Sequence, residues 1–261
     1  MRLAVGIEYD GSGYNGWQRQ KTGIGVQQRV EEALSRVADH DLEVTCAGRT
    51  DTGVHASGQV GHFDSPSQRS RRGWLLGANS NLPDDISLTW VASVPGDFHA
   101  RFSATARSYR YRILNRLVRT ALARHRAWWV YQPLDAERMH ESAQALVGEH
   151  DFSAFTVKLS KTDKNPVRNI YKIEIKEIDN FICITFIGKS FLYKMVRSLV
   201  GTFVKAGEGK ISSQEVKKIL NSKDRSNAHN TAPAKGLFLM KVFYNKKELK
   251  NYKLKSLPLL T

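Results

Sequence analysis

The order of strand-like and helix-like segments repeats along this chain, and the repeat limits the folds that it can adopt. Apolar spacing in the first part predicts the order strand, helix, strand, strand, helix, strand. The expected strands there are 3–9, 42–46, 59–63 and 86–94, and the expected helices are 25–39 and one within 71–82. The second part repeats this order, with strands at 108–114, 170–178, 181–187 and 237–244 and helices at 135–147 and 191–205. An extra helix at 213–222 has Ser212 or Ser213 as its N-cap.

This order is that of a ferredoxin-like split βαβ unit, used twice. We therefore expect an α+β fold of two ferredoxin-like split βαβ domains, residues 1–104 and 105–261. Their sheets are expected to join into an extended, mostly antiparallel sheet with helices on one side and a basic central cleft. The two halves share little sequence identity, so the repeat is one of architecture.

The charge of the chain indicates a polyanionic partner. Among 261 residues, lysines and arginines exceed aspartates and glutamates by 15, and such a field attracts nucleic acid. A membrane is the competing polyanion, but no apolar run approaches the ~18 residues of a spanning helix, and the N-terminus lacks the apolar centre of a signal peptide. Cys46 and Cys183 are too few for a disulfide framework or a cysteine-based zinc site. These features predict a cytoplasmic protein without a membrane anchor.

The run Cys46–Ala56 follows a predicted strand and presents one carboxylate, Asp51, beside one arginine, Arg49. Gly48 and Gly53 allow the backbone a sharp excursion there. A carboxylate held near a fixed positive charge stays ionised, which suits a nucleophile or a general base rather than a proton donor. An ordinary acidic turn with a local ion pair explains the same residues equally well.

Tyr109 and Tyr111 alternate with Arg110 and Arg112, so a strand presents tyrosines on one face and arginines on the other. We expect Tyr111 to lie on the face of this strand that packs in the core, and the arginines to lie on the opposite face, in contact with solvent. Tyr109, at the expected start of the strand, reaches a cleft.

Two further groups of side chains are candidates for RNA contact. In helix 191–205, Lys194 and Arg197 lie off the apolar stripe and are neighbours, and by itself Arg197 is most simply a surface charge. Basic and aromatic residues also interleave after the fourth strand, a pattern that suits phosphate contact and base stacking and that a packed linker also fits. This second set is Phe98, His99, Arg101 and Phe102, with Arg69 as a candidate phosphate contact. His55, His62 and His99 have no metal-ligand spacing, so we expect no metal.

Four motifs, in order, resemble those of the tRNA pseudouridine synthase A family, and they cover essentially the whole chain. The first two are Glu8-Tyr9-Asp10-Gly11-x-x-Tyr14-x-Gly16-Trp17-Gln18 and Gly48-Arg49-Thr50-Asp51-x-Gly53-Val54-His55. The others are Phe98-His99-Ala100-Arg101-Phe102-Ser103-Ala104 and Phe191-Leu192-Tyr193-x-Met195-Val196-Arg197. Gly236-Leu237-Phe238-Leu239 fits the family as well.

The resemblance implies an isomerase that converts uridine to pseudouridine at positions 38 to 40 of the anticodon stem-loop of tRNA, without cofactor or metal. It implies that Asp51 opens the reaction, by attacking the sugar or the base or by removing a ribose proton. Tyr109 then stacks on the target uracil, Arg197 partners Asp51, and Arg49 helps hold the flipped base out of the helix. The family works as a homodimer, with one tRNA touching both subunits.

Two readings from other classes stay open. Asp51-Thr52-Gly53 is the triplet of dimeric aspartic proteases, although Arg49 opposes the shared proton that such a pair needs. A non-catalytic RNA-binding module would explain the positive net charge of the chain, but it would not explain the Asp51 loop.

The basic residues change type along the chain. Residues 1–156 hold 17 of the 20 arginines and 1 of the 20 lysines, and the remaining residues hold 3 arginines and 19 lysines. RNA binding does not predict this exchange, because both side chains neutralise phosphates. Our hypothesis is that the chain joins segments of different origin within 139–157, a stretch without lysine or arginine. If the GC content and codon usage of the coding DNA were uniform across this stretch, this hypothesis of two origins would be contradicted.

Overall fold

The computed structural model describes residues 1–157 and 165–250 and divides the chain into two compact units. Unit 1 comprises Met1–Thr105 and the segment that begins at Phe238, and unit 2 comprises Ala106–Leu237. Unit 1 thus includes most of the C-terminal strand, since Phe238 and Leu239 pair with His55 and Ala56. The domains expected from the sequence, 1–104 and 105–261, stay a prediction.

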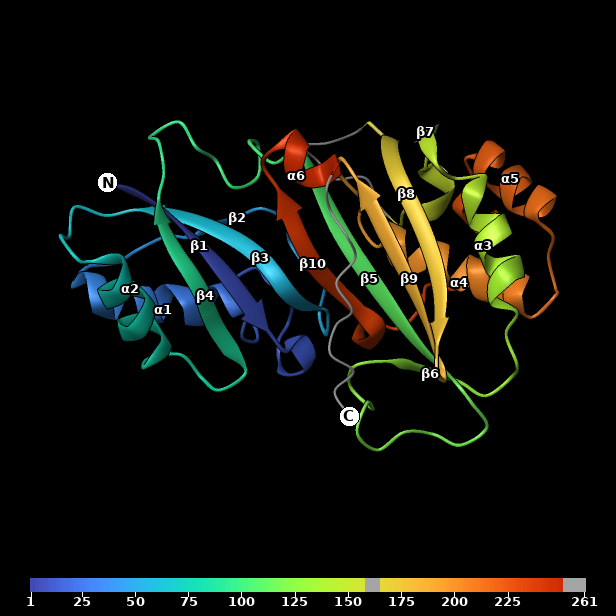
Figure 1. Cartoon of the computed structure of the whole chain (residues 1–261), viewed down its shortest axis with the longest axis horizontal. Helices are drawn as coiled ribbons and strands as arrows, with labels where there is room; N and C mark the ends of the chain where they lie inside the picture. The colour runs from blue at the N-terminus through green and yellow to red at the C-terminus, as the bar shows by residue number, and fades with distance from the viewer. Residues whose placement is uncertain (158–164, 251–261) are drawn as a thin grey trace. The chain divides into compact units, whose positions relative to one another are not determined.

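The strands of unit 1 lie in the order β4-β1-β3, with antiparallel neighbours (Figure 1). They are β1 (Arg2–Tyr9), β3 (His55–Asp64) and β4 (Ile86–Ser93). The second edge of β3 is shared by two strands. The short β2 (Thr45–Cys46) pairs antiparallel with the end of β3, and β10 (Leu237–Phe243) pairs parallel with its start.

The two long helices of unit 1 form where apolar residues recur at helical spacing. They are α1 (Val26–Ala38) and α2 (Arg71–Asn79), and a short helix, α6 (Lys246–Lys250), follows β10. The Ser70 hydroxyl accepts the N–H of Gly73 and so caps the first turn of α2. Trp74 on α2 is fully buried and meets Phe63 edge-on, with ring centroids 5.2 Å apart. This contact fastens α2 to β3.

The strands of unit 2 lie in the order β5-β9-β8-β7, again with antiparallel neighbours. They are β5 (Ala106–Asn115), β7 (Gly148–Asp151), β8 (Val167–Ile178) and β9 (Phe181–Gly188). A short strand, β6 (Trp128–Val130), pairs parallel with the end of β5. The sequence did not predict β6 or β7, which have three and four residues. Both units are thus α+β with mostly antiparallel strands, as expected.

The helices of unit 2 are α3 (Ala136–Gln144), α4 (Met195–Gly207) and α5 (Ser213–Ser222). The predicted bounds of α5 are confirmed, and its N-cap is Ser212. Helix α4 begins four residues later than predicted, because Lys194 adopts a left-handed conformation with φ of 58° and ends the preceding loop. Four short 3₁₀ segments complete the described elements: Gly11–Gly13, Ser153–Phe155, Arg225–Asn227 and Ala234–Gly236.

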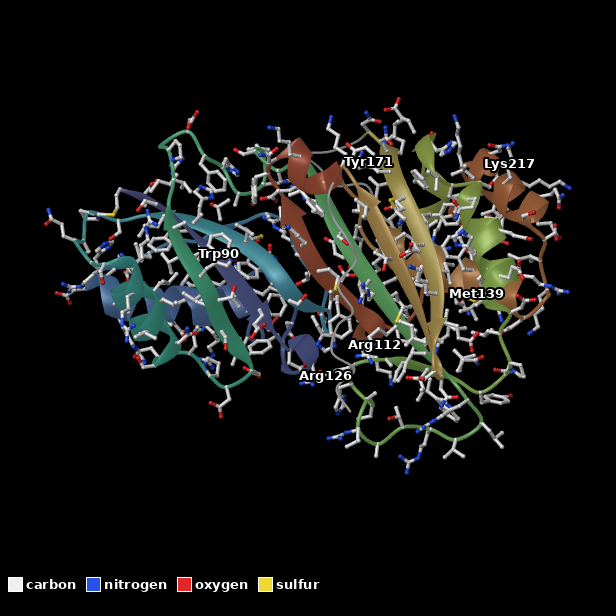
Figure 2. All side chains as sticks on the ribbon, in the orientation of Figure 1. Trp90, Arg112, Arg126, Met139, Tyr171 and Lys217 are labelled. Atoms are coloured by element: carbon white, nitrogen blue, oxygen red, sulfur yellow. The ribbon has the colours of Figure 1, made fainter. Side chains whose placement is uncertain are left out.

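The arginine face of β5 is not a solvated back, contrary to expectation. Arg110 and Arg112 are 6% and 5% exposed. Arg112 (Figure 2) lies over the ring of Phe181, 4.6 Å from its centroid, and Arg110 donates to the Thr185 hydroxyl at 3.3 Å. Burial lowers the pKa of Arg112. Tyr111 is fully buried, as predicted.

Candidate active site

Asp51 lies in the loop between β2 and β3, in a tight turn. The N–H of Val54 donates to the carbonyl of Asp51 at 3.1 Å. Gly53, the third residue of this turn, has φ of 76°, as a type II turn requires. Residues other than glycine rarely adopt this backbone conformation, so Gly53 fixes the turn that presents the half-buried Asp51.

The segment that follows β1 holds the Asp51 loop through backbone and hydroxyl groups. The N–H of Trp17 donates to the carbonyl of Thr50 at 3.0 Å, and the N–H of Gly53 donates to that of Tyr14 at 3.4 Å. The Thr50 and Tyr9 hydroxyls lie 2.8 Å apart in a buried hydrogen bond. The residue before Asp51 is therefore fixed through both its backbone and its side chain.

Two glycines let this segment approach the loop closely. Gly16 has φ of 82°, and a Cβ added to it lies 2.5 Å from the carbonyl oxygen of Thr50. A Cβ on Gly11 lies 2.0 Å from the carbonyl oxygen of Val54. Any side chain at either position displaces the loop, so the motif around Tyr14–Gln18 and the Asp51 motif form one structure.

His55 closes the other end of the loop. Its Nδ1 accepts the N–H of Gly11 at 3.1 Å and lies 3.2 Å from a carboxylate oxygen of Asp10. Both contacts tie the His55 ring to the segment that follows β1. The ring is 1% exposed and stacks on Phe238, with centroids 4.6 Å apart. His55 is thus a buried structural residue.

A buried carboxylate on α1 positions the strand that leads to the loop. Glu31, 4% exposed, accepts the N–H of Val44 at 3.0 Å and the side-chain amide of Gln27 at 2.9 Å. Arg19 lies 3.1 Å from its second oxygen. Burial raises the pKa of Glu31, and these hydrogen bonds oppose the rise. Sequence reasoning missed this network, because its only local signal is an acid on the inner face of a helix.

Arg49 is exposed, whereas Asp51 is half-buried. The reading of the loop as an acidic turn with a local ion pair stays a prediction. Burial raises the pKa of the nearby Cys46 thiol to about 11, although Arg49 and Arg101 oppose the rise. Cys46 is consequently a protonated thiol and not a nucleophile at neutral pH.

Unit 2 brings Tyr109 and Arg197 to the segment around α4. Tyr109 is the fourth residue of β5, which begins two residues earlier than expected, and its ring meets that of Phe191 edge-on at 5.2 Å. Burial raises the pKa of Tyr111, and the positive charge of Arg197 opposes this. Arg197 is half-buried, and its Nε donates to the carbonyl of Ala232 at 2.8 Å, whose own N–H donates back to Arg197 at 3.0 Å. Arg197 is therefore a held side chain and not a loose surface charge.

Lys194 lies at the residue before α4, where its left-handed backbone turns the chain into the helix. Its ammonium lies over the ring of the exposed Tyr193, 5.1 Å from the centroid. Lys194 and Tyr193 thus form an outward cation–aromatic pair.

The four interleaved residues after β4 divide into one that packs inward and three that form an outer group. Phe98 packs inward, with its ring 5.0 Å from Tyr244. Phe102 is 75% exposed, lies 4.3 Å from the His99 ring and carries the Arg101 guanidinium 5.6 Å from its centroid. Phe98 is therefore a packing residue, whereas His99, Arg101 and Phe102 form an outward platform.

Arg69 is exposed beside the end of α1. Its Nε donates to the carbonyl of Val37 at 3.3 Å. The structure thus gives it a capping bond near the last turn of the helix, while the end of its guanidinium stays at the surface.

Comparison with known proteins decides the family of this chain. A family model described as tRNA pseudouridine synthase matches residues 6–103 and 142–245. A protein named tRNA pseudouridine synthase A from Coxiella burnetii is 47% identical over 99% of this chain and 97% of its own. Proteins of the same name from Pseudoalteromonas atlantica and Klebsiella pneumoniae are 48% and 46% identical, each over 94% of this chain and 92% and 90% of theirs. This chain belongs to the tRNA pseudouridine synthase family.

Asp51 and Arg197 both lie within the segments that match the pseudouridine synthase model, and Tyr109 lies between them. A solved structure, of a Cbf5-Nop10-Gar1 complex, aligns with 91% of this chain and 48% of its own at 10% identity. Its TM-score of 0.37 is too low to support an argument.

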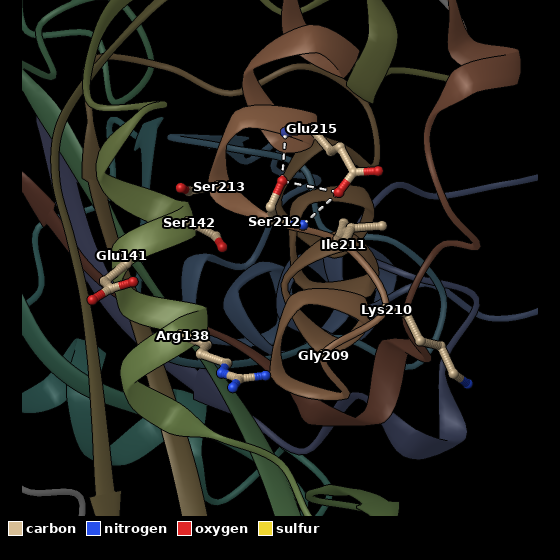
Figure 3. Close-up of a pocket in the computed structure, with 9 residues that line it drawn as sticks. All are labelled: Arg138, Glu141, Ser142, Gly209, Lys210, Ile211, Ser212, Ser213 and Glu215. Atoms are coloured by element: carbon tan, nitrogen blue, oxygen red, sulfur yellow. Dashed lines mark hydrogen bonds between the residues drawn. The ribbon is translucent and has the colours of Figure 1, made fainter.

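A hollow of about 360 Å³ in unit 2 is distinct from the candidate catalytic residues of this synthase (Figure 3). It is lined by Arg138, Glu141, Ser142 and residues 209–213 and 215. The start of α5, which faces it, is already capped, because Glu215 accepts the N–H of Ser212 at 2.7 Å. We therefore do not assign it to the reaction.

Among residues 1–157 and 165–250, no group of three or more His, Cys, Asp and Glu side chains is arranged to hold a metal ion. Within the same ranges, no helix is long and apolar enough to cross a membrane.

Proposed function

We propose that this protein isomerises uridine to pseudouridine at positions 38, 39 and 40 of the anticodon stem-loop of tRNA. The family makes the reaction class that of an isomerase acting on uridine in tRNA. The observation that carries the proposal is the position of Asp51. It lies in a matched segment, in a loop held by Trp17, Tyr14 and a left-handed Gly16.

The proposed chemistry is an exchange of one bond for another within a single nucleotide. The bond between N1 of uracil and C1′ of ribose breaks, the uracil turns, and a bond from C5 to C1′ forms. The C5 proton leaves to solvent and N1 takes up a proton from solvent, so the product is an isomer of the substrate. Asp51 opens this sequence, as nucleophile or as base. Because nothing is oxidised or hydrolysed, the proposal includes no cofactor and no metal.

The other proposed roles follow the character of each side chain. We propose that Asp51, Tyr109 and Arg197 act on the same nucleotide, with Tyr109 stacking on the uracil. Arg49, exposed beside Asp51 in the sequence, holds the flipped nucleotide out of its helix. The outward platform of His99, Arg101 and Phe102 supports an unstacked base, since such stacking contributes about 1–3 kcal/mol per base. Lys194 and Arg69 contact phosphates.

The proposal extends to the assembly. The enzyme is a cytoplasmic homodimer, and one tRNA touches both subunits. The net charge of +15 supports a polyanionic substrate.

The test is tritium release from tRNA labelled at C5 of uridine, with Asp51→Asn as the key variant. The wild type releases tritium, and Asp51→Asn loses at least about 1,000-fold in rate while its affinity for tRNA stays within a few fold. Turnover retained by Asp51→Asn, in a preparation free of host enzyme, would falsify the assignment of Asp51. A wild type that binds tRNA without releasing tritium favours the RNA-binding module instead. Cleavage of peptides favours the protease reading.

A further inference from the structure

The loop between β5 and β6 has a composition unlike the rest of unit 2. From residue 116 to residue 127 it contains Arg116, Arg119, Arg124, Arg126 and His125, and the next acid along the chain is Asp135. The sequence reading passed over this loop, although its four arginines without an acid were visible. The loop lies outside the two segments that match the family model.

Two arginines of this loop, Arg116 and Arg124, are held in place by hydrogen bonds to the backbone of the same loop. Arg116 donates to the carbonyls of Val118 at 2.8 Å and Arg119 at 3.2 Å, and Arg124 donates to Ala121 at 3.2 Å. Among the described residues, no carboxylate forms an ion pair with Arg116, Arg119 or Arg124, all of which are exposed. Their charge is therefore not neutralised within the described chain.

Aromatic side chains stand at the foot of the loop. Trp129 donates its indole N–H to the carbonyl of Arg116 at 2.9 Å, which ties the two ends of the loop together. Tyr131 is 55% exposed, and its ring lies 6.1 Å from that of Trp129. Exposed rings beside arginines suit RNA, because bases stack on both rings and guanidinium planes.

The loop is also apolar at its tip. Leu117, Val118 and Leu122 are 79%, 65% and 83% exposed. A second copy of this chain is the competing occupant of such a surface. Four arginines without an acid favour RNA over another molecule of this chain, which itself carries a net charge of +15.

The loop is well separated from Tyr109. Seven residues of extended chain lead from Tyr109 to Arg116, which corresponds to roughly 23 Å at about 3.3 Å per residue. A contact there therefore involves nucleotides other than the one stacked on Tyr109.

We propose that the 116–127 loop, with Trp129 and Tyr131, is a second RNA-contact surface that binds the phosphate backbone of the tRNA away from the target uridine. This proposal rests on tRNA being the substrate, as proposed above. The surface contributes to affinity and not to the chemical step. Arg119 and Arg124 supply the charge, and Tyr131 supplies a stacking face.

The test compares Arg119→Gln/Arg124→Gln with Lys217→Gln/Lys218→Gln, a pair that removes the same charge from the exposed face of α5 (Figure 2 labels Lys217). The loop variant should bind tRNA about 10-fold more weakly, with the slope of log K against log salt reduced by about 1 to 2. Its KM should rise while kcat stays within about 2-fold of the wild type. The lysine pair should change neither affinity nor slope.

The outcomes separate this proposal from the proposed function. If the wild type releases tritium and the loop variant matches the lysine pair, the loop assignment is overturned and the function stands. If the wild type binds tRNA through the loop but releases no tritium, the function is overturned and the loop assignment stands. Light scattering, which measures the oligomeric state of both variants, tests whether a second copy of this chain occupies the loop instead. Loss of a dimer in the loop variant, with tRNA affinity per subunit unchanged, assigns the loop to a second copy and contradicts RNA contact.

Discussion

The Asp51 loop and the 116–127 loop differ in what holds them. The Asp51 loop is fixed from outside, by the N–H of Trp17, the carbonyl of Tyr14 and a glycine that leaves no space for a side chain. Arg116 and Arg124 of the 116–127 loop donate to carbonyls of that same loop, and its leucines face outward. Chemistry on one bond needs atoms placed to within fractions of an ångström, whereas a contact with phosphate needs charge and reach. The Asp51 loop is thus built to position one side chain, whereas the 116–127 loop is built to present positive charge.

The largest expected effect comes from breaking the frame of the Asp51 loop with Gly16→Ala. The new methyl group meets the carbonyl of Thr50, and alanine is strained at φ of 82°. We expect a loss of at least about 2 kcal/mol in the free energy of unfolding and a fall of more than about 10-fold in kcat. Urea unfolding and tritium release measure the two effects.

Gly13→Ala is the matched control for Gly16→Ala. A Cβ at Gly13 meets nothing within 4 Å. We expect stability and activity close to those of the wild type. Equal behaviour of the two variants contradicts the view that close approach at Gly16 positions Asp51.

A smaller effect is expected from the buried acid behind the loop. Glu31→Ala leaves the N–H of Val44 and the amide of Gln27 without their acceptor and should cost about 1–3 kcal/mol of stability. Glu32→Ala, on the same helix, removes an exposed ion pair with Arg29 and should cost less than about 1 kcal/mol. Urea titrations at pH 7 compare them, and equal losses contradict the positioning role.

Glu31→Gln tests the pH dependence of the same site. Burial raises the pKa of Glu31 in the folded protein above 4.5, its value in the unfolded chain. At a pH between the unfolded-state and folded-state pKa, the folded protein therefore binds more protons than the unfolded chain. The contribution of Glu31 to stability is therefore full at the low-pH end of this window and falls as the pH rises through it. Relative to Glu31→Gln, the wild type should gain stability as the pH is lowered from 7 toward 4.5. A difference that does not vary with pH contradicts this.

The smallest effect is expected in the 116–127 loop, from Arg119→Lys. The charge is kept, and among the described residues the Arg119 guanidinium makes no hydrogen bond whose geometry a lysine loses. Affinity for tRNA should stay within about 2-fold of the wild type at each salt concentration. A 10-fold loss, measured by filter binding, shows that the position of the guanidinium matters there and removes the contrast with the Asp51 loop.

Local signals predicted the elements well where caps and periodicity agree. The bounds of α5 follow from Ser212 and Glu215, which form a capping box in the sequence and in the structure. Helix α4 began late, since the apolar pattern continues through Leu192 while the backbone at Lys194 is left-handed. Apolar spacing does not report such a single backbone angle.

What sequence reasoning missed is non-local. Period-two spacing separated the tyrosine and arginine faces of β5, but it does not say which face is covered, and Arg112 is buried against Phe181. The Asp51 loop was found from its residues. Its dependence on Gly11 and Gly16 appears only when two segments some forty residues apart in the sequence are brought together.

The pairing of β10 with the start of β3 has a consequence for the order of synthesis. Phe238, which pairs with His55 and stacks on its ring, is made 183 residues after it. At about 5–20 residues per second, that edge of the nascent β3 waits roughly 10–40 s for its partner. A product that stops short of Phe238 contains the whole Asp51 motif but exposes an unpaired strand edge beside it, a place where chains aggregate. Translation of β10 is therefore the step that covers this edge of β3 beside the Asp51 loop.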